Sequence, residues 1–344
     1  MSTVRVVITS PLSSENVAAI AAADPRLDVV YERDLIPAPE YPSAHPLPKI
    51  ADASTEERWV ELLESAEILF DFGPLPLLDR LPDWPRLRWI QATSAGVGQL
   101  ARRVGLTERR DVVITTASGV HARPLAEFAV LAMLMFGKDV LRYQADQRAH
   151  RWQRHAGEEV AGKVVAVVGA GRIGREASRL LGALDAHVVG VVRTVAGRGP
   201  ADVHADEIAA IEDLDSILPR LDAIVLATPH TPETEGLLDA RRIALLPERA
   251  IVVNIARGDV VDEAALAEAL AAGRLRGAAL DVFTTEPPPD TSPFWDLPNV
   301  LVSPHSASTV AEENDRIVEI FCENLHAYLA GRPLRNVLDP DLLY

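Results

Sequence analysis

Cysteine is nearly absent from this chain of 344 residues, with Cys322 the only one. An intramolecular disulfide is therefore excluded, and so is a zinc site built on several cysteines. Long apolar runs are missing too, since none approaches the roughly 18 residues that a membrane helix needs. The opening residues, MSTVRVVITSPLSS, lack a basic region followed by an apolar stretch and a small-residue cleavage site. We therefore expect no secretory signal and a cytoplasmic location.

Positive charge is scarce. The chain has 34 lysines and arginines against 50 aspartates and glutamates, a formal net charge of -16 at pH 7. This balance argues against a nucleic acid held by its phosphates, although a few well-placed arginines can still hold a small anionic ligand. No pair of histidines has the spacing of a helical metal site, so we expect no metal. We interpret the scarcity of lysine as composition bias; the lysines are Lys49, Lys138 and Lys163.

Short β-branched runs alternate with stretches rich in alanine and leucine. The content of 48% hydrophobic and 24% charged residues is ordinary for a globular protein, and the alternation predicts α/β domains with parallel sheets. We expect strands at Val4–Thr9, Val29–Tyr31, Ile68–Phe72, Leu87–Thr93, Val112–Thr116, Val164–Val168, His187–Val192, Ala223–Ala227, Ile251–Asn254, Ala278–Asp281 and Val300–Val302. We expect helices at Asn16–Ala22, Thr55–Ser65, Leu125–Phe136, Val140–Trp152, Ile173–Leu184 and Glu263–Ala272.

Three segments carry further expectations. Leu35–Pro48 contains five prolines, which exclude a helix or a central strand, so we expect a surface excursion of the first domain. Leu125–Phe136 is apolar nearly all round, which predicts burial in a core or an interface. Thr309 and Glu312 have the spacing of a capping box, and we expect them to begin a last helix that runs to about Leu329.

A glycine-rich motif follows the strand expected at Val164–Val168 and begins a helix. It reads Gly169-Ala170-Gly171-Arg172-Ile173-Gly174, a G-x-G-x-x-G match. In this context the first glycine permits a tight turn, the second lets the backbone approach a pyrophosphate, and the third allows close packing of helix and strand. The helix N-terminus supplies amide groups for phosphates. We therefore predict a dinucleotide site that includes Gly169, Gly171, Arg172, Ile173 and Gly174.

The end of the next strand discriminates between the two nicotinamide cofactors. An NAD site usually places Asp or Glu there to bind the ribose hydroxyl. This chain has Arg193 and Thr194 instead, with Arg198 close behind, and a guanidinium can pair with a 2′-phosphate. We therefore expect NADP(H) to be favoured, with NAD(H) possible. The alternative is that Arg193 is a solvated loop residue.

Three later segments place polar residues at or just beyond the ends of expected strands. Open parallel sheets bind ligands at this edge, so an arginine, a glutamate and a histidine on separate loops can converge on one ligand. The segments are Asn254–Gly258, Leu280–Pro287 and Ser303–Ser306. Motifs of serine hydrolases, zinc proteases and P-loop proteins are absent from the sequence.

Together and in this order, the motifs resemble the D-isomer-specific 2-hydroxyacid dehydrogenase family, which includes glyoxylate/hydroxypyruvate reductases. The resemblance covers essentially the whole chain. It rests on the glycine motif, Ser94-Ala95-Gly96-Val97-Gly98, Thr228-Pro229-His230-Thr231-Pro232-Glu233-Thr234, Asn254–Gly258, Leu280–Pro287 and Ser303–His305.

The resemblance implies an α/β fold of two Rossmann/flavodoxin-like parallel-sheet domains, with the active site in the interdomain cleft. Residues 1–119 together with 308–344 would form the substrate-binding domain, and residues 120–307 the dinucleotide-binding domain. Closure on the substrate should exclude water. His121 lies where the chain passes between the domains, and we expect a structural or hinge role for it.

The resemblance also implies a reaction, the transfer of a hydride between the nicotinamide and C2 of a 2-keto acid or D-2-hydroxy acid. Arg257 matches the arginine that binds the substrate carboxylate and polarises its keto oxygen. His305 matches the acid/base, and Glu286 matches the carboxylate that orients the imidazole. Asp281 matches the residue that holds the nicotinamide carboxamide.

Further contacts follow from the same resemblance. The backbone of Ser94, Ala95, Gly96, Val97 and Gly98 would donate N–H groups to the substrate carboxylate. The expected cofactor contacts also include Thr228, Pro229 and Ala256. The two helices after Pro124 are expected to contribute to a symmetric homodimer.

Other functions stay open at this point. The family includes transcriptional corepressors, so a nucleotide-sensing binding protein is the main alternative to a 2-keto acid reductase. A dehydrogenase acting on another small substrate, such as phosphite, is a further alternative. A formate dehydrogenase is disfavoured because Pro304, not glutamine, precedes His305.

Overall fold

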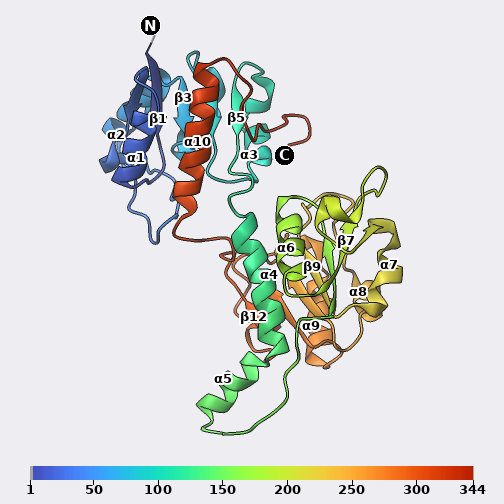
Figure 1. Cartoon of the computed structure of the whole chain (residues 1–344). Helices are drawn as coiled ribbons and strands as arrows, with labels where there is room; N and C mark the ends of the chain where they lie inside the picture. The colour runs from blue at the N-terminus through green and yellow to red at the C-terminus, as the bar shows by residue number, and fades with distance from the viewer. Residues whose placement is uncertain (1–2, 344) are drawn as a thin grey trace. The chain divides into compact units, whose positions relative to one another are not determined.

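Parallel β-sheets organise both parts of the chain (Figure 1). The computed structural model describes residues 3–343. Two compact units divide the chain, the first made of Met1–Val120 and Thr309–Tyr344, the second of His121–Ser308. Each unit has its own sheet and its own buried core.

The first unit contains a five-stranded sheet with the order β2-β1-β3-β4-β5, in which every pairing is parallel. This is the strand order of flavodoxin-like folds. Its strands are β1 (Val4–Ile8), β2 (Leu27–Val30), β3 (Ile68–Phe70), β4 (Trp89–Gln91) and β5 (Val113–Thr115). Its helices are α1 (Ser14–Ala22), α2 (Ala53–Ser65), α3 (Gly98–Arg103) and α10 (Glu313–Leu329), with a 3-10 segment η2 (Leu75–Asp83).

Helices cover both faces of this sheet, as parallel sheets require. On one face, Ile20 of α1 and Phe321 of α10 pack in a cluster with Ile8 and Trp89. On the other face, α2, η2 and α3 supply a second cluster around the opposite side chains of the same strands. Alternate residues of each strand therefore enter different cores.

The second unit contains a seven-stranded parallel sheet with the order β12-β11-β10-β9-β6-β7-β8. The order reverses between β6 and β9, which in Rossmann folds marks the place where a dinucleotide binds. Its strands are β6 (Val164–Val168), β7 (His187–Val192), β8 (Glu207–Ala210), β9 (Ala223–Leu226), β10 (Ile251–Asn254), β11 (Gly277–Leu280) and β12 (Val300–Val302). Its helices are α4 (Ala122–Gly137), α5 (Val140–Arg148), α6 (Arg172–Gly182), α7 (Leu214–Ile217), α8 (Ala240–Leu245) and α9 (Glu263–Ala271).

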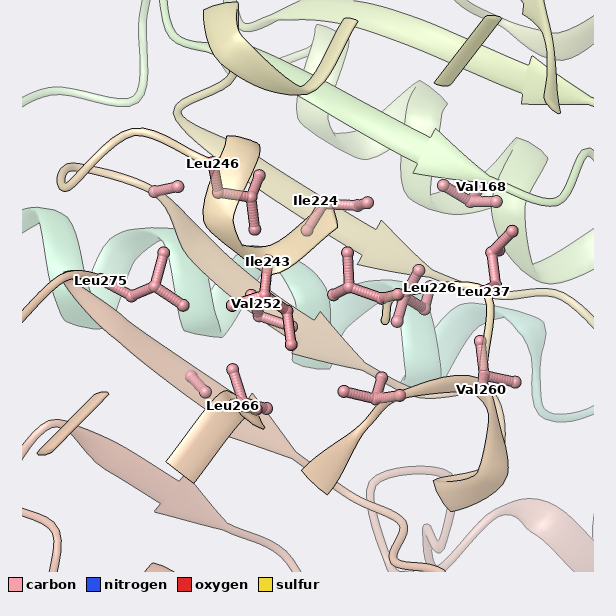
Figure 2. Packing of buried hydrophobic residues seen from close by; sticks show 14 of the residues in the cluster. Val168, Ile224, Leu226, Leu237, Ile243, Leu246, Val252, Val260, Leu266 and Leu275 are labelled. Carbon is pink, nitrogen blue, oxygen red and sulfur yellow. The ribbon is translucent and has the colours of Figure 1, made fainter. Parts of the chain in front are cut away.

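Alternate side chains of strand β6 pack into two different cores. Ala166 and Val168 belong to the cluster under α8 and α9, which Figure 2 shows around Ile224, Val252 and Leu266. The intervening residues of β6 belong to the cluster beneath α4 and α6. The apolar run of β6 is thus buried on both sides, which fixes the position of the glycine motif that follows it.

The expected architecture of two parallel-sheet α/β units is confirmed. All expected strands are present, with ends that differ by at most two residues. The sequence reading missed β8, a short strand at the sheet edge whose residues are only partly buried. It also missed α3, α7 and α8, which are too short to show an apolar period.

Two helix boundaries were wrong. The helix expected at Val140–Trp152 ends at Arg148, because His150 adopts a left-handed backbone conformation with φ of 52°. The last helix does not begin with a capping box at Thr309 and Glu312. A turn in which the Glu313 amide donates to the Val310 carbonyl precedes it, and the Glu312 side chain makes no capping hydrogen bond.

The proline-rich segment Leu35–Pro48 is more buried than expected. Residues 37–48 form no helix or strand, as expected, and residues 38–42 are all exposed. Leu35 and Ile36 are nevertheless buried in a core cluster, and Ser43 and Ala44 are buried as well. The segment is therefore anchored at several points. Among the residues that the structure describes, no helix is both long and apolar enough to cross a membrane.

Candidate active site

The glycine motif occupies the turn between β6 and α6. Gly169 has a φ of 105°, which side chains rarely adopt, and a Cβ there would lie 2.7 Å from the Ala227 carbonyl oxygen. A Cβ at Gly174 would lie 1.7 Å from the Gly169 carbonyl oxygen. At Gly171, the residue before α6, a Cβ would meet no atom within 4 Å. The turn is therefore tightly packed at Gly169 and Gly174, whereas Gly171, beside the N-terminus of α6, is open.

A pocket of 380 Å³ lies beside this turn. Gly171, Arg172 and Arg175 contribute to its lining from the start of α6, and His204 contributes from the segment before β8. Arg193 and Thr194 directly follow β7, and both are exposed. Glu176 lines the same pocket. Neither Arg175 nor His204 was identified from the sequence. Arg175 lies one helical turn beyond Arg172 and could have been inferred from that spacing, whereas His204 is brought near only by the fold.

Arg257 lies on a turn directly after β10. Asn254, the last residue of β10, holds this turn, because its amide donates to the Arg257 carbonyl at 3.0 Å and its side-chain oxygen accepts from the Ala256 amide at 3.0 Å. The Arg257 guanidinium is exposed, and its Nη1 donates to the Ala256 carbonyl at 2.6 Å. Ala256 itself is buried.

Gly258 lets this turn approach the loop after β11. A Cβ at Gly258 would lie 2.0 Å from the Thr284 amide nitrogen and 2.1 Å from the Phe283 carbonyl carbon. The Thr284 amide and hydroxyl both donate to Glu263, at the start of α9. The loop that carries Arg257 and the loop that carries Glu286 are consequently fixed against each other.

His305 and Glu286 form a hydrogen-bonded pair. His305 Nδ1 lies 2.8 Å from Glu286 Oε2, while the other carboxylate oxygen accepts from the Phe283 amide at 3.0 Å. The His305 side chain is 48% exposed. Burial acts to raise the pKa of Glu286, but hydrogen bonds from His305 and the Phe283 amide, helped by the charges of His305 and Arg257, outweigh it. The pKa of Glu286 therefore lies below its ordinary value, and the carboxylate is ionised at neutral pH.

Asp281 fixes the His305 loop by hydrogen bonds. It is 2% exposed, and its Oδ1 accepts from the Ser303 hydroxyl at 2.6 Å and from the Ser306 and Ala307 amides at 2.9 Å each. Its carbonyl accepts from the His305 amide at 2.9 Å. This positioning role of Asp281 was not expected from the sequence, because none of the partners is recognisable as such in a linear reading.

Arg257, Glu286, His305 and Asp281 are thus gathered at the carboxyl edge of the second sheet. Thr228 and Pro229 follow β9 at the same edge, and Thr228 is buried. The Ser94–Gly98 loop belongs to the first unit, where it joins β4 to α3. Within residues 3–343, no group of three or more His, Cys, Asp or Glu side chains is arranged to hold a metal ion.

The backbone of the Ser94–Gly98 loop is accessible. Ser94, Ala95 and Gly96 are exposed, whereas Val97 is buried. Asp71, after the neighbouring strand β3, has a φ of 73° and accepts a hydrogen bond from the Thr93 hydroxyl at 3.0 Å. A non-glycine residue in this conformation is strained, and such strain often occurs at functional sites.

A Rossmann sheet with a glycine turn at its switch point, together with a histidine–carboxylate pair and an exposed arginine at the same sheet edge, is typical of dinucleotide-dependent dehydrogenases. Comparison with known proteins agrees. The family model described as D-isomer specific 2-hydroxyacid dehydrogenase, NAD binding domain, matches residues 130–307. The chain therefore belongs to the D-isomer specific 2-hydroxyacid dehydrogenase family, as the motifs suggested, and it has the NAD-binding domain of that family.

Several relatives carry more specific names. D-3-phosphoglycerate dehydrogenase of Mycobacterium leprae (strain TN) is 36% identical over 259 residues, which cover 75% of this chain and 48% of the relative. The chain thus spans about half the length of the first such relatives. Glyoxylate/hydroxypyruvate reductase B of Pectobacterium carotovorum subsp. carotovorum (strain PC1) is 32% identical over 288 residues, covering 82% of this chain and 88% of the relative.

Among solved structures, the NADPH-dependent glyoxylate/hydroxypyruvate reductase of Sinorhizobium meliloti, in complex with NADP and sulfate, is similar over most of its length. The TM-score is 0.77 and the sequence identity 27%, and the match covers 99% of this chain and 100% of the other.

The contact at Gly258 generates a prediction about stability. Replacing Gly258 with alanine inserts a Cβ into the backbone of the adjoining loop, and we expect the free energy of unfolding to fall by about 1–3 kcal/mol. Gly182→Ala is the matched control, because a Cβ there meets no atom within 4 Å and lies at the end of α6; we expect no loss. Urea unfolding followed by circular dichroism measures both. Equal stability of the two variants would contradict the contact.

Proposed function

We propose that this protein is a 2-keto acid reductase related to the glyoxylate/hydroxypyruvate reductases, which uses NADPH in preference to NADH. The observation that carries the proposal is the 2.8 Å hydrogen bond between His305 and an ionised Glu286, beside the exposed guanidinium of Arg257. This is the constellation that proton transfer to a carbonyl oxygen next to a carboxylate requires.

His305 would act as the acid in reduction. With Nδ1 donating to Glu286, Nε2 is the ring atom that exchanges a proton with the substrate oxygen. The Glu286 carboxylate fixes the orientation of the ring through this hydrogen bond. When bound, the reduced nicotinamide supplies the hydride that adds to C2, so a proton from His305 completes the alcohol.

Arg257 would bind the substrate carboxylate. Its planar fork offers two parallel N–H donors, and its charge also polarises the keto oxygen. The Ser94–Gly98 loop is our proposal for the backbone donors to the same carboxylate. Its support is that the Ala95 and Val97 amides donate to no other group among the described residues.

The residues around the glycine turn fit a dinucleotide. The open approach at Gly171 leaves room for a pyrophosphate at the N-terminus of α6, beside Arg172 and Ile173. We propose that Arg193 and Thr194 hold the ribose 2′-phosphate, and that Thr228, Pro229 and Ala256 contribute further contacts. Oδ2 of Asp281 would accept from the nicotinamide carboxamide, since Oδ1 already accepts three hydrogen bonds.

The acid/base role is tested by His305→Gln. Because the amide cannot transfer a proton, we expect kcat for keto acid reduction to fall about 10²–10⁴-fold, while NADPH binding survives. Steady-state kinetics and fluorescence titration of NADPH measure the two effects. An unchanged kcat would refute the assignment.

Glu286→Gln serves as the companion variant. The pKa of Glu286 lies below its ordinary value, so the carboxylate is charged throughout the assay range, and its removal takes away the charged acceptor that orients the His305 ring. We therefore expect kcat in reduction to fall about 10-fold or more, while NADPH binding survives. NADPH binding without turnover of any keto acid, in the unmodified protein, would support the nucleotide-sensing alternative instead.

The cofactor preference is tested by Arg193→Ala. Loss of one charge-assisted contact, worth about 1.5–3 kcal/mol, should raise KM for NADPH about 10- to 100-fold and leave KM for NADH nearly unchanged. Arg274→Ala is the matched control, because Arg274 is an exposed arginine between α9 and β11. Equal losses for both cofactors would show that Arg193 does not contact the phosphate.

We further propose that the chain forms a homodimer through α4 and α5. Leu131 and Leu134 lie on one face of α4 and are 49% and 39% exposed, and Tyr143 of α5 is 48% exposed. A second copy would cover these side chains. Light scattering should give twice the mass of one chain, and the double variant Leu131→Glu, Leu134→Glu should give a single-chain mass. Leu342→Glu, at a residue 57% exposed, should remain dimeric. A monomeric unmodified protein would contradict the proposal.

A further inference from the structure

A cavity of 270 Å³ in the first unit is not explained by the contacts assigned so far. It lies at the carboxyl ends of β3 and β4, where Asp71 and Phe72 follow one strand and Thr93 and Ser94 follow the other. Most of its walls are apolar, formed by Leu47, Phe72, Leu75, Leu78, Val97 and Leu100.

Leu47 and Leu75 are unusually exposed for residues that border a cavity within a core. Phe72, Leu78 and Val97 are buried, at 3%, 2% and 7% exposed, and form the floor. Leu47 and Leu75, by contrast, are 46% and 54% exposed, although both border the cavity. Two large exposed leucines on one concavity indicate an apolar ligand rather than a satisfied core.

The charges of the cavity argue against an anionic occupant. Asp71 and Arg103 both border it, so the formal charges cancel. The Asp71 carboxylate is already occupied, with Oδ1 accepting from the Phe72 amide at 2.9 Å and Oδ2 from the Thr93 hydroxyl at 3.0 Å. A phosphate or a second carboxylate would find a single exposed arginine opposed by this fixed negative charge.

The location of the cavity identifies which part of a substrate would enter it. Ser94 and Val97 belong both to its lining and to the loop whose amides we assign to the substrate carboxylate. A keto acid held there by its carboxylate would have the substituent on C2 within reach of the cavity. We propose that this cavity receives the apolar side chain of a 2-keto acid, so that the preferred substrate carries a branched aliphatic or aromatic group. The inference rests on the proposed function and concerns only the ranking of substrates.

The volume is sufficient for such a group. An apolar cavity of about 150 Å³ can hold a benzene molecule, so 270 Å³ accommodates a phenyl ring or a branched four-carbon chain. Glyoxylate has no side chain and would leave the cavity unused. Each methylene buried there should add to transition-state binding, within the roughly 10- to 200-fold that one such group can contribute.

The proline-rich segment contributes Leu47 to the cavity wall. Leu47 stands between Pro46 and Pro48, which restrict its backbone. The segment is also tied down upstream, because the Ser43 hydroxyl donates to the Val310 carbonyl at 3.0 Å and Ser10 Oγ lies 2.7 Å from His45 Nδ1. Leu47 is therefore held in place as part of the cavity wall, although it belongs to no helix or strand.

The experiment compares kcat/KM across a panel of keto acids with saturating NADPH. The panel contains glyoxylate, hydroxypyruvate, 4-methyl-2-oxopentanoate, phenylpyruvate, 2-oxoglutarate and 3-phosphohydroxypyruvate. We expect phenylpyruvate and 4-methyl-2-oxopentanoate to exceed glyoxylate at least tenfold. A preference for glyoxylate or hydroxypyruvate, or for either of the two acids with a second anionic group, would overturn the inference.

Variants at the rim test the cavity itself. Leu75→Ser should lower kcat/KM for phenylpyruvate about tenfold and change that for glyoxylate less than twofold, because glyoxylate does not reach Leu75. Val337→Ser, at a residue that is 50% exposed and does not border the cavity, should change neither. Equal losses for both substrates in Leu75→Ser would overturn the assignment, and the glyoxylate activity shows that the variant is folded.

The panel also distinguishes a wrong ranking of substrates from a wrong proposed function. Turnover of keto acids with the wrong ranking overturns only the side-chain cavity. Absence of turnover with every keto acid, in protein that binds NADPH, contradicts the proposed function itself.

Discussion

A single buried carboxylate oxygen organises the candidate active site. Oδ1 of Asp281 accepts hydrogen bonds from the Ser303 hydroxyl and from the Ser306 and Ala307 amides, and so fixes the loop on both sides of His305. Because the oxygen is buried, loss of these bonds would leave several donors unsatisfied. The imidazole is therefore held by hydrogen bonds to a neighbouring strand end, and its reach toward Glu286 follows from that.

In both units the groups that can contact a ligand lie at the carboxyl ends of the strands, but the chemical character of these groups differs. Each sheet is parallel and covered on both faces, so its polar, ligand-facing groups can lie only at the strand ends. In the second unit these ends carry charged and titratable side chains. In the first unit they carry accessible amides beside a mostly apolar cavity.

Local signals were sufficient for much of this structure. Most strands of the second sheet are short, contain β-branched residues and are bounded by turns, and the glycine motif needs only its two flanking elements to be recognised. The placement of Arg257, Glu286 and His305 at one edge of the sheet could be predicted because each follows a strand and parallel strands end at the same edge; the roles assigned to them came from the family resemblance. Non-local features were not found: the triple acceptor role of Asp281, the approach of Gly258 to Phe283, and the placement of His204 beside Arg175 all depend on tertiary packing. The supposed capping box failed for a related reason, since two residues at the right spacing also fit an ordinary turn.

The backbone of His305 has a φ of 53°, a left-handed conformation that few residue types adopt easily. Asparagine and glycine tolerate it, whereas β-branched residues do not. Asparagine or glycine at this position would therefore preserve the turn while removing the imidazole that lies against Glu286. A relative with such a substitution could keep the sheet and the glycine turn unchanged, because the backbone of this loop would not have to move.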